Sequence, residues 1–236
     1  MAYKFESRVR YSEMDMEQKL TRMALVDYFQ DCSTFQSEEC NNGLAYLRSK
    51  GMAWMILSWQ IEILRRPSLG EKITTATWPY GFKAFYGYRN YAMYDASGET
   101  LAEANSVWAL IDVETGHPAR VTPEIINSYP PMEEKLSMEE CSRKIQVPKE
   151  QERKDALQVC RYHLDVNRHV NNGQYIRMAE EYLPPRFEPK RLRVEYRRQA
   201  KLHDMIVPMV HEEQDKIVVS LCDEQENPYS IIEYSR

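Results

Sequence analysis

The chain of 236 residues lacks the features that would assign it to several common classes of protein. Its five cysteines are scattered and none forms a Cys-x-x-Cys pair, so the sequence indicates neither a disulfide framework nor a zinc site. The apolar run over residues 52–57 is far too short to span a membrane, and the first residues contain no apolar signal segment. We therefore expect reduced thiols, a cytoplasmic location and no membrane span.

Positive charge is in the minority. The 31 lysines and arginines are outnumbered by 36 aspartates and glutamates, and the net charge of −5 argues against nucleic-acid binding. No phosphate-binding loop, metal-ligand cluster or cofactor fingerprint is present, so we expect no metal and no cofactor. With 43% hydrophobic residues, the chain is long enough for one large domain or two small ones that each bury a core.

The most informative stretch runs from Leu164 to Asn172. Asp165, Asn167 and His169 place a carboxylate, an amide and an imidazole at alternate positions, so these groups can converge on one side of an extended loop. The residues that follow suit the start of a helix, where free backbone N–H groups can face a developing oxyanion. The candidates for that role are Asn171, Asn172 and Gly173. A polar, well-capped loop without chemistry is the alternative.

The chain repeats this pattern once. Arg10-Tyr11-Ser12-Glu13-Met14-Asp15 resembles Arg161-Tyr162-His163-Leu164-Asp165, and the two aspartates lie 150 residues apart. Apolar spacing predicts a helix after each copy, over residues 21–41 and 172–182. Strand patterns follow each helix, at residues 53–64, 72–79, 85–95 and 100–112, and then at 190–199, 205–211, 216–223 and 228–234.

This order of elements predicts an α+β fold in which a long helix is wrapped by an antiparallel sheet, twice. We expect a first unit over residues 1–121, a connecting segment rich in prolines over residues 122–157, and a second unit over residues 158–236. Lys19 occupies the first-copy position of His169, so one active site per chain, in the second unit, fits the pattern.

Three ordered motifs resemble the acyl-ACP thioesterases of plants and bacteria, over residues 10–234. They are Arg65-Arg66-Pro67-Ser68-Leu69-Gly70 before a strand ending in Thr77-Trp78, Ala104-Asn105-Ser106-Val107-Trp108, and Asp165-Val166-Asn167-Arg168-His169-Val170-Asn171-Asn172 followed by Tyr175-Ile176. The resemblance implies a double hot-dog fold. It also implies hydrolysis of the thioester between a fatty acyl chain and the phosphopantetheine arm of acyl carrier protein, which would be the partner.

The resemblance further implies that the first unit houses the acyl chain and that the second supplies the catalytic groups Asp165, Asn167 and His169. The apolar candidates for acyl binding are Met23, Phe29, Met52, Trp54, Ile56 and Trp108, each of which could also be an ordinary core residue.

One departure from the family pattern bears on the mechanism. Plant members continue with a strand reading Tyr-Arg-Arg-Glu-Cys, where this chain has Tyr196-Arg197-Arg198-Gln199-Ala200. Alanine has no nucleophile and glutamine takes up no proton, so water is the expected nucleophile. We predict that His169, oriented by a polar neighbour, activates it and that Asn167 holds the water or the carbonyl. Asp165 would orient these groups or stabilise the imidazolium, and Gln199 would position the water.

Basic residues cluster after the second helix, and a basic patch beside the active site would dock an acidic carrier protein. The cluster consists of Arg186, Lys190, Arg191, Arg193, Arg197, Arg198 and Lys201. The exposed face of a strand is the alternative explanation for it. For the whole protein, a thioesterase acting on acyl-coenzyme A and a catalytically impaired acyl-binding protein stay open, and either a monomer or a homodimer fits the sequence.

Overall fold

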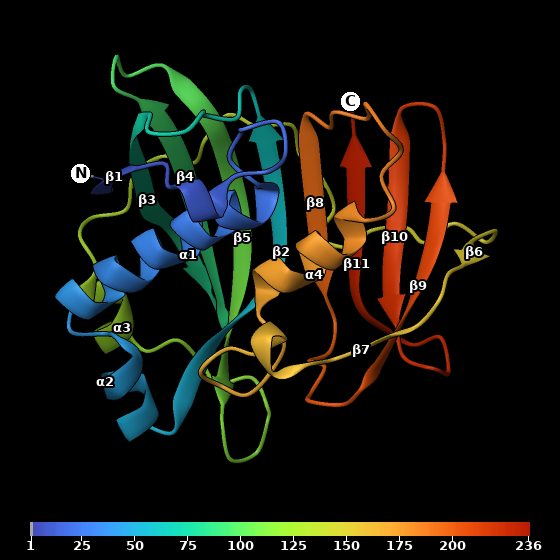
Figure 1. Ribbon diagram of the computed structural model, residues 1–236. Helices are drawn as coiled ribbons and strands as arrows, with labels where there is room; N and C mark the ends of the chain where they lie inside the picture. The colour runs from blue at the N-terminus through green and yellow to red at the C-terminus, as the bar shows by residue number, and fades with distance from the viewer. Residues whose placement is uncertain (1) are drawn as a thin grey trace. The chain divides into compact units, whose positions relative to one another are not determined.

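A computed structural model describes residues 2–236 (Figure 1). The chain forms two compact units. The first comprises the residues up to Leu57 together with Leu64–Cys141, and the second comprises Ser58–Ile63 together with Ser142–Arg236. Strand β2 (Met52–Ile63) therefore contributes its first half to one unit and its second half to the other.

The first unit packs one long helix against an antiparallel sheet. Strands β1 (Tyr3–Arg8), β3 (Lys72–Lys83), β4 (Tyr86–Asp95) and β5 (Thr100–Asp112) lie side by side in that order. Helix α1 (Arg22–Glu39) crosses the face of this sheet (Figure 1). It begins at Thr21, whose hydroxyl accepts the N–H of Ala24, and buries Phe29 and Cys32 completely. The short helices α2 (Leu44–Ser49) and α3 (Pro123–Ser128) complete the unit.

The second unit repeats the arrangement with a shorter helix. Its sheet runs from Ser58–Ile63 of β2 through β8 (Arg191–Tyr196), β11 (Pro228–Ser235), β10 (Lys216–Cys222) and β9 (Met205–Glu212) to β6 (Glu152–Arg153), and β7 (Leu157–Gln158) also pairs with β9. Helix α4 (Asn172–Glu180) packs on β10 and β11. The hydroxyl of Tyr234 donates to the backbone oxygen of Ile176 and ties the helix to the sheet. Each unit is thus a helix against an antiparallel sheet, as the α+β prediction requires.

Both predicted helices and all eight predicted strands are present, with shifted ends. The structure adds β1, α2, α3, the two-residue strands β6 and β7, and a 3-10 turn before each hairpin, none of which was predicted. Strand β8 ends at Tyr196 instead of Gln199, because the N–H groups of Arg197 and Arg198 both turn to the backbone oxygen of Tyr229. This correction matters for the site, since it moves Gln199 and Ala200 out of the strand and into the segment that follows.

Three further properties are plain from the structure. No helix within residues 2–236 is long and apolar enough to cross a membrane. The same residues hold no group of histidine, cysteine or carboxylate side chains placed to share a metal ion. All five cysteines are free thiols.

Candidate active site

The stretch singled out in the sequence folds as a tight hairpin in the second unit. The N–H of Asp165 donates to the oxygen of His169 (2.8 Å), and the N–H of Arg168 donates to the oxygen of Asp165 (3.0 Å). Arg168 lies in the left-handed region with φ 63°. A turn closed by one left-handed residue is a common three-residue hairpin loop, and it places residues 166–168 at the tip. The loop is followed directly by α4, whose N-cap is Asn171.

The carboxylate of Asp165 shapes this loop from the inside. Its Oδ1 accepts the backbone N–H of Asn167 (2.8 Å) and, more loosely, that of His169 (3.4 Å). Its Oδ2 lies 3.5 Å from the side-chain nitrogen of Asn167. Aspartate side chains commonly bond the backbone two residues on in this way. The predicted trio is therefore brought together through Asp165, with Asn167 exposed at the tip and His169 half-buried at the base.

His169 is held by its backbone rather than by a side-chain partner. It forms a bridge with Lys201, and the N–H of the next residue, Val170, donates to the oxygen of Ala200 (3.0 Å). The ring nitrogen Nδ1 is buried and has no hydrogen-bond partner among residues 2–236. The expected polar neighbour that orients the imidazole is thus absent at Nδ1, which corrects that part of the sequence prediction. The nitrogen left for chemistry is Nε2.

Ala200 and Gln199 lie opposite this loop, on the segment after β8. Ala200 is completely buried, and its N–H donates to the hydroxyl of Tyr175 on α4 (2.9 Å). Gln199, its neighbour, is exposed. Position 200 therefore faces the interior of the unit, while position 199 faces outward.

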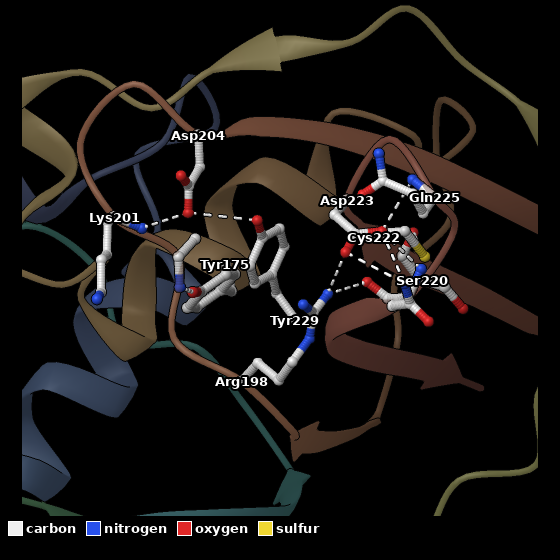
Figure 2. A network of polar contacts seen from close by, with 11 residues as sticks. Tyr175, Arg198, Lys201, Asp204, Ser220, Cys222, Asp223, Gln225 and Tyr229 are labelled. Atoms are coloured by element: carbon white, nitrogen blue, oxygen red, sulfur yellow. Dashed lines mark hydrogen bonds and ion pairs between the residues drawn. The ribbon is translucent and has the colours of Figure 1, made fainter.

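A polar network fixes the segment that carries these two residues (Figure 2). Asp204 accepts the N–H of Lys201 (2.9 Å) and the hydroxyl of Tyr229 (3.3 Å). The guanidinium of Arg198 stacks on the Tyr229 ring, 4.7 Å from its centroid. Burial, together with Asp204, raises the pKa of Tyr229, so its hydroxyl stays protonated as a donor. The contact between Lys201 and Asp204 is local, but the sequence carries no local signal for the contacts of Tyr229, which comes from a separate strand.

The backbone groups predicted to form an oxyanion hole are largely engaged within the loop. The N–H of Asn171 donates to the oxygen of His163 (2.9 Å), and the N–H of Gly173 donates to the side-chain oxygen of Asn171 (2.8 Å). Asn172 lies between them, and its oxygen accepts the hydroxyl of Tyr196 (3.0 Å). Asn171 acts as a helix cap and consumes a donor that an oxyanion would need. The prediction is therefore corrected for Asn171 and Gly173.

The basic cluster on and after β8 is not the free positive surface that the sequence suggested. Four of its seven members have carboxylate partners within the second unit: Arg191 with Glu62 (2.6 Å), Arg193 with Glu233 (2.7 Å), Arg197 with Glu195 (3.0 Å) and Arg198 with Asp223 (2.8 Å). The remaining three, Arg186, Lys190 and Lys201, are exposed. Strand β8 is thus close to charge-balanced, which favours the exposed face of a strand as the explanation for the cluster.

The apolar candidates lie in the first unit at different depths. Phe29 and Ile56 are buried, and the Phe29 ring lies 5.3 Å from that of Tyr91. Met52 and Trp54 pack on a cluster of core residues that includes Leu110. The two others, Met23 and Trp108, are half-buried. A role in acyl binding stays a prediction for all six.

The first unit contains a second copy of the hairpin with a different chemistry. The N–H of Asp15 donates to the oxygen of Lys19 (2.9 Å), and Gln18 takes the left-handed conformation with φ 60°. Here the charge of the carboxylate is balanced, because the buried guanidinium of Arg66 forms an ion pair with Asp15. Burial alone would raise the pKa of Asp15, but the hydrogen bonds from Lys19 and Arg66 outweigh it and lower the pKa.

Arg66 in the first unit and Gln199 in the second occupy equivalent positions, as their backbone contacts show. The N–H of Leu20 donates to the oxygen of Pro67, as that of Val170 does to Ala200, so the residue before each acceptor takes the same place. The first loop therefore has lysine and an arginine-bound carboxylate, whereas the second has an imidazole and a carboxylate with no cationic partner among the described residues.

Comparison with known proteins agrees with this two-unit arrangement. Residues 1–129 match the family model of the acyl-ACP thioesterase N-terminal domain, and residues 146–232 match that of the C-terminal domain. Oleoyl-acyl carrier protein thioesterase 2 of Arabidopsis thaliana is 27% identical over 188 residues, which are 74% of this chain and 51% of that protein. The FATB3 acyl-[acyl-carrier-protein] hydrolase of Cuphea viscosissima is 26% identical over 82% of this chain and 50% of its own length. The chain thus spans about half the length of these curated relatives.

Solved structures share the fold. An acyl-ACP thioesterase from Bacteroides thetaiotaomicron superposes with a TM-score of 0.91 at 21% identity, covering 99% of this chain and 97% of that one. The 12:0-ACP thioesterase from Umbellularia californica gives a TM-score of 0.85 at 16% identity, covering 99% and 96%. The fold is the double hot-dog, and with both domain models matched in order the chain belongs to the acyl-ACP thioesterase family.

Proposed function

We propose that this protein hydrolyses fatty acyl-acyl carrier protein to free fatty acid and carrier protein with a free thiol. The main support for the proposal is the second hairpin. There His169 lies in one loop with Asp165, whose carboxylate has no cationic partner among the described residues, and the chain matches both domains of the family. The names of the relatives, which are acyl-ACP thioesterases and hydrolases, support the same substrate class.

In the proposed mechanism His169 accepts a proton from water, and the water oxygen attacks the thioester carbonyl. The carbon–sulfur bond then breaks, and the proton passes from the imidazole to the departing thiolate. Asn167 is exposed at the loop tip, where its amide can hold the water or the carbonyl oxygen. Asp165 keeps these residues in place through its two backbone hydrogen bonds. Gln199 is exposed on the facing segment and would help to position the water.

Neither cysteine of the second unit is placed to act as the nucleophile, which leaves water for that role. Cys222 is buried, and burial together with Asp223 and Glu226 raises the pKa of its thiol to about 11, so it stays protonated. Cys160 is half-buried, and its sulfur contacts the backbone oxygen of Gln158. Ala200, at the position where the family resemblance expects cysteine, has no nucleophile.

Restoring that cysteine is not expected to create a catalytic nucleophile. Position 200 is completely buried and faces Tyr175, so the thiol of an Ala200→Cys variant would be shielded and its pKa raised by burial. We expect kcat within about threefold of wild type and no faster labelling by iodoacetamide than the native thiols show. Gln199→Cys, at the exposed neighbour, is the matched control and should be labelled readily. Rapid labelling of Cys at position 200 with a large rise in kcat would contradict this.

A panel of substrates tests the proposed function itself. Fatty-acid release from acyl-carrier-protein and acyl-coenzyme A thioesters of several chain lengths would be measured by mass spectrometry. We expect release from the carrier substrates at a kcat/KM at least about tenfold above that for coenzyme A substrates, since a carrier protein offers additional contacts. A preference for coenzyme A would identify the alternative thioesterase. Acyl binding without turnover on any substrate would show that the protein is an acyl-binding member without hydrolase activity.

The cellular location and the oligomeric state stay proposals. Free thiols at all five cysteines agree with a reducing compartment, and we propose the cytoplasm. A double fold supplies within one chain what a single unit would gain from a second copy, which favours a monomer over a homodimer.

A further inference from the structure

Three exposed cations without a carboxylate partner lie on the second hairpin and on the segment that faces it. The side chains of Arg161, Arg168 and Lys201 are exposed, and no ion pair joins them to a carboxylate within residues 2–236. This contrasts with Arg191 and Arg193 on β8, whose charges are balanced by Glu62 and Glu233. Cations without internal partners are the ones available to an external anion.

These three residues belong to the hairpin that holds His169 or to the segment facing it. Arg168 precedes it in the loop, and Lys201 forms a backbone bridge with it from the facing segment. Arg161 lies at the base of the hairpin, where its oxygen accepts the N–H of Leu164 (3.2 Å). Positive charge is therefore carried by the hairpin itself and by the segment that faces it.

The same hairpin and the turn before it also expose large apolar side chains. Tyr162 is 74% exposed and Val166 is 81% exposed, although both belong to well-hydrogen-bonded loops. Exposed apolar groups rimmed by charged ones are typical of surfaces that bind another protein. We use the term loop rim for the surface formed by Arg161, Tyr162, Val166, Arg168 and Lys201.

The first unit provides an internal contrast. Its hairpin also exposes apolar side chains, with Tyr11 at 85% and Met16 at 103%. Its cations, however, are all paired with carboxylates of the same loop: Arg10 with Glu13 (3.3 Å), Lys19 with Glu17 (4.0 Å) and Arg66 with Asp15. Of the two hairpins, the second is therefore the one with exposed cations that lack a carboxylate partner among residues 2–236, and it is also the one with the imidazole.

We propose that the loop rim is the surface on which the acidic carrier protein docks. This inference rests on the proposed function and assigns the partner's contact site. The carrier presents carboxylates and a phosphodiester at the root of its arm, which exposed arginine and lysine can bind, while Tyr162 and Val166 pack on its apolar residues. Docking at the rim also places the root of the arm beside the hairpin that holds His169, which keeps the path of the thioester short.

The experiment measures kcat/KM for acyl-carrier-protein and for the same acyl group on free pantetheine, with Tm as a check of folding. Arg168→Gln is the first variant, because Gln18 occupies the same left-handed position in the first hairpin and shows that glutamine fits there. We expect the ratio of carrier to pantetheine activity to fall about twofold to fivefold, as for loss of one exposed ion pair. The triple variant Arg161→Gln, Arg168→Gln, Lys201→Gln should lower the ratio about tenfold or more and flatten its dependence on salt.

The matched control is Gln18→Glu, which alters charge at the equivalent position of the first hairpin and should leave the ratio unchanged. An unchanged ratio in the triple variant, or an equal fall with Gln18→Glu, would overturn the docking site while leaving the proposed function intact. If wild type hydrolyses no carrier substrate, the proposed function fails instead. Carrier binding, measured by fluorescence anisotropy on the same variants, then decides the docking site on its own.

Discussion

Replacing His169 by alanine is expected to lower kcat for acyl-carrier-protein by about a hundredfold to ten-thousandfold, the range that general-base catalysis contributes. The loss should fall on kcat more than on KM, because the imidazole acts in the transition state and the acyl chain is expected to be housed elsewhere. The measurement is steady-state release of fatty acid, with Tm recorded in parallel. Little change in Tm is expected, since Nδ1 has no hydrogen-bond partner to lose within residues 2–236.

Lys19→Ala provides the matched control, because Lys19 takes the equivalent position in the first hairpin. It removes a side chain of similar length from the same kind of turn and should leave kcat unchanged. A His169→Ala variant that kept near-native turnover would eliminate His169 as the base. Equal losses in both variants would point to a structural effect of the hairpins rather than to the chemistry of one imidazole.

The elements that could be predicted from the sequence are those with strong local periodicity. The long helices and the eight strands have apolar spacing that follows from packing on one face, and they were placed within a few residues of their observed ends. Strand β1 (Tyr3–Arg8) was missed although its sequence carries a signal, because Tyr3 and Phe5 alternate with the charged residues Lys4, Glu6 and Arg8 as in a half-buried strand. The end of β8 depends on one distant carbonyl, that of Tyr229, which no local pattern can indicate.

The candidate site divides in the same way. The loop that joins Asp165, Asn167 and His169 could be predicted, because short polar residues around a turn bond their own backbone. The oxyanion assignment contained a conflict visible in the sequence, since an asparagine that caps a helix consumes the backbone donors it was expected to leave free. The ion pairs of β8 could not be foreseen, because Arg191 meets Glu62 only after the sheet has formed across 129 residues of sequence.

Two substitutions at Asp165 separate its charge from its hydrogen bonds. Asp165→Asn keeps an oxygen at Oδ1 for the N–H groups of Asn167 and His169, whereas Asp165→Ala removes it. If the carboxylate acts by shaping the loop, kcat should fall about a hundredfold in the alanine variant, as for a misplaced catalytic group, and less than about tenfold in the asparagine variant. Equal and large losses in both would show that the negative charge, by stabilising the imidazolium, is what matters.

The first hairpin again supplies the control, with a different expected result. Asp15→Asn keeps the loop oxygen but removes the nearer of the two carboxylates that pair with the buried guanidinium of Arg66, whose side chain is 6% exposed, and leaves the exposed Glu17 at 3.7 Å. We expect a loss of unfolding free energy on the order of 2 kcal/mol and an unchanged kcat, measured by urea denaturation and fatty-acid release. Asp165→Asn should show the reverse, with lower kcat and unchanged stability. The carboxylate of Asp165 has no cationic partner among the described residues, so the substitution leaves no buried charge unpaired. The same substitution in two copies of one hairpin thus tests whether the first carboxylate serves stability and the second serves catalysis.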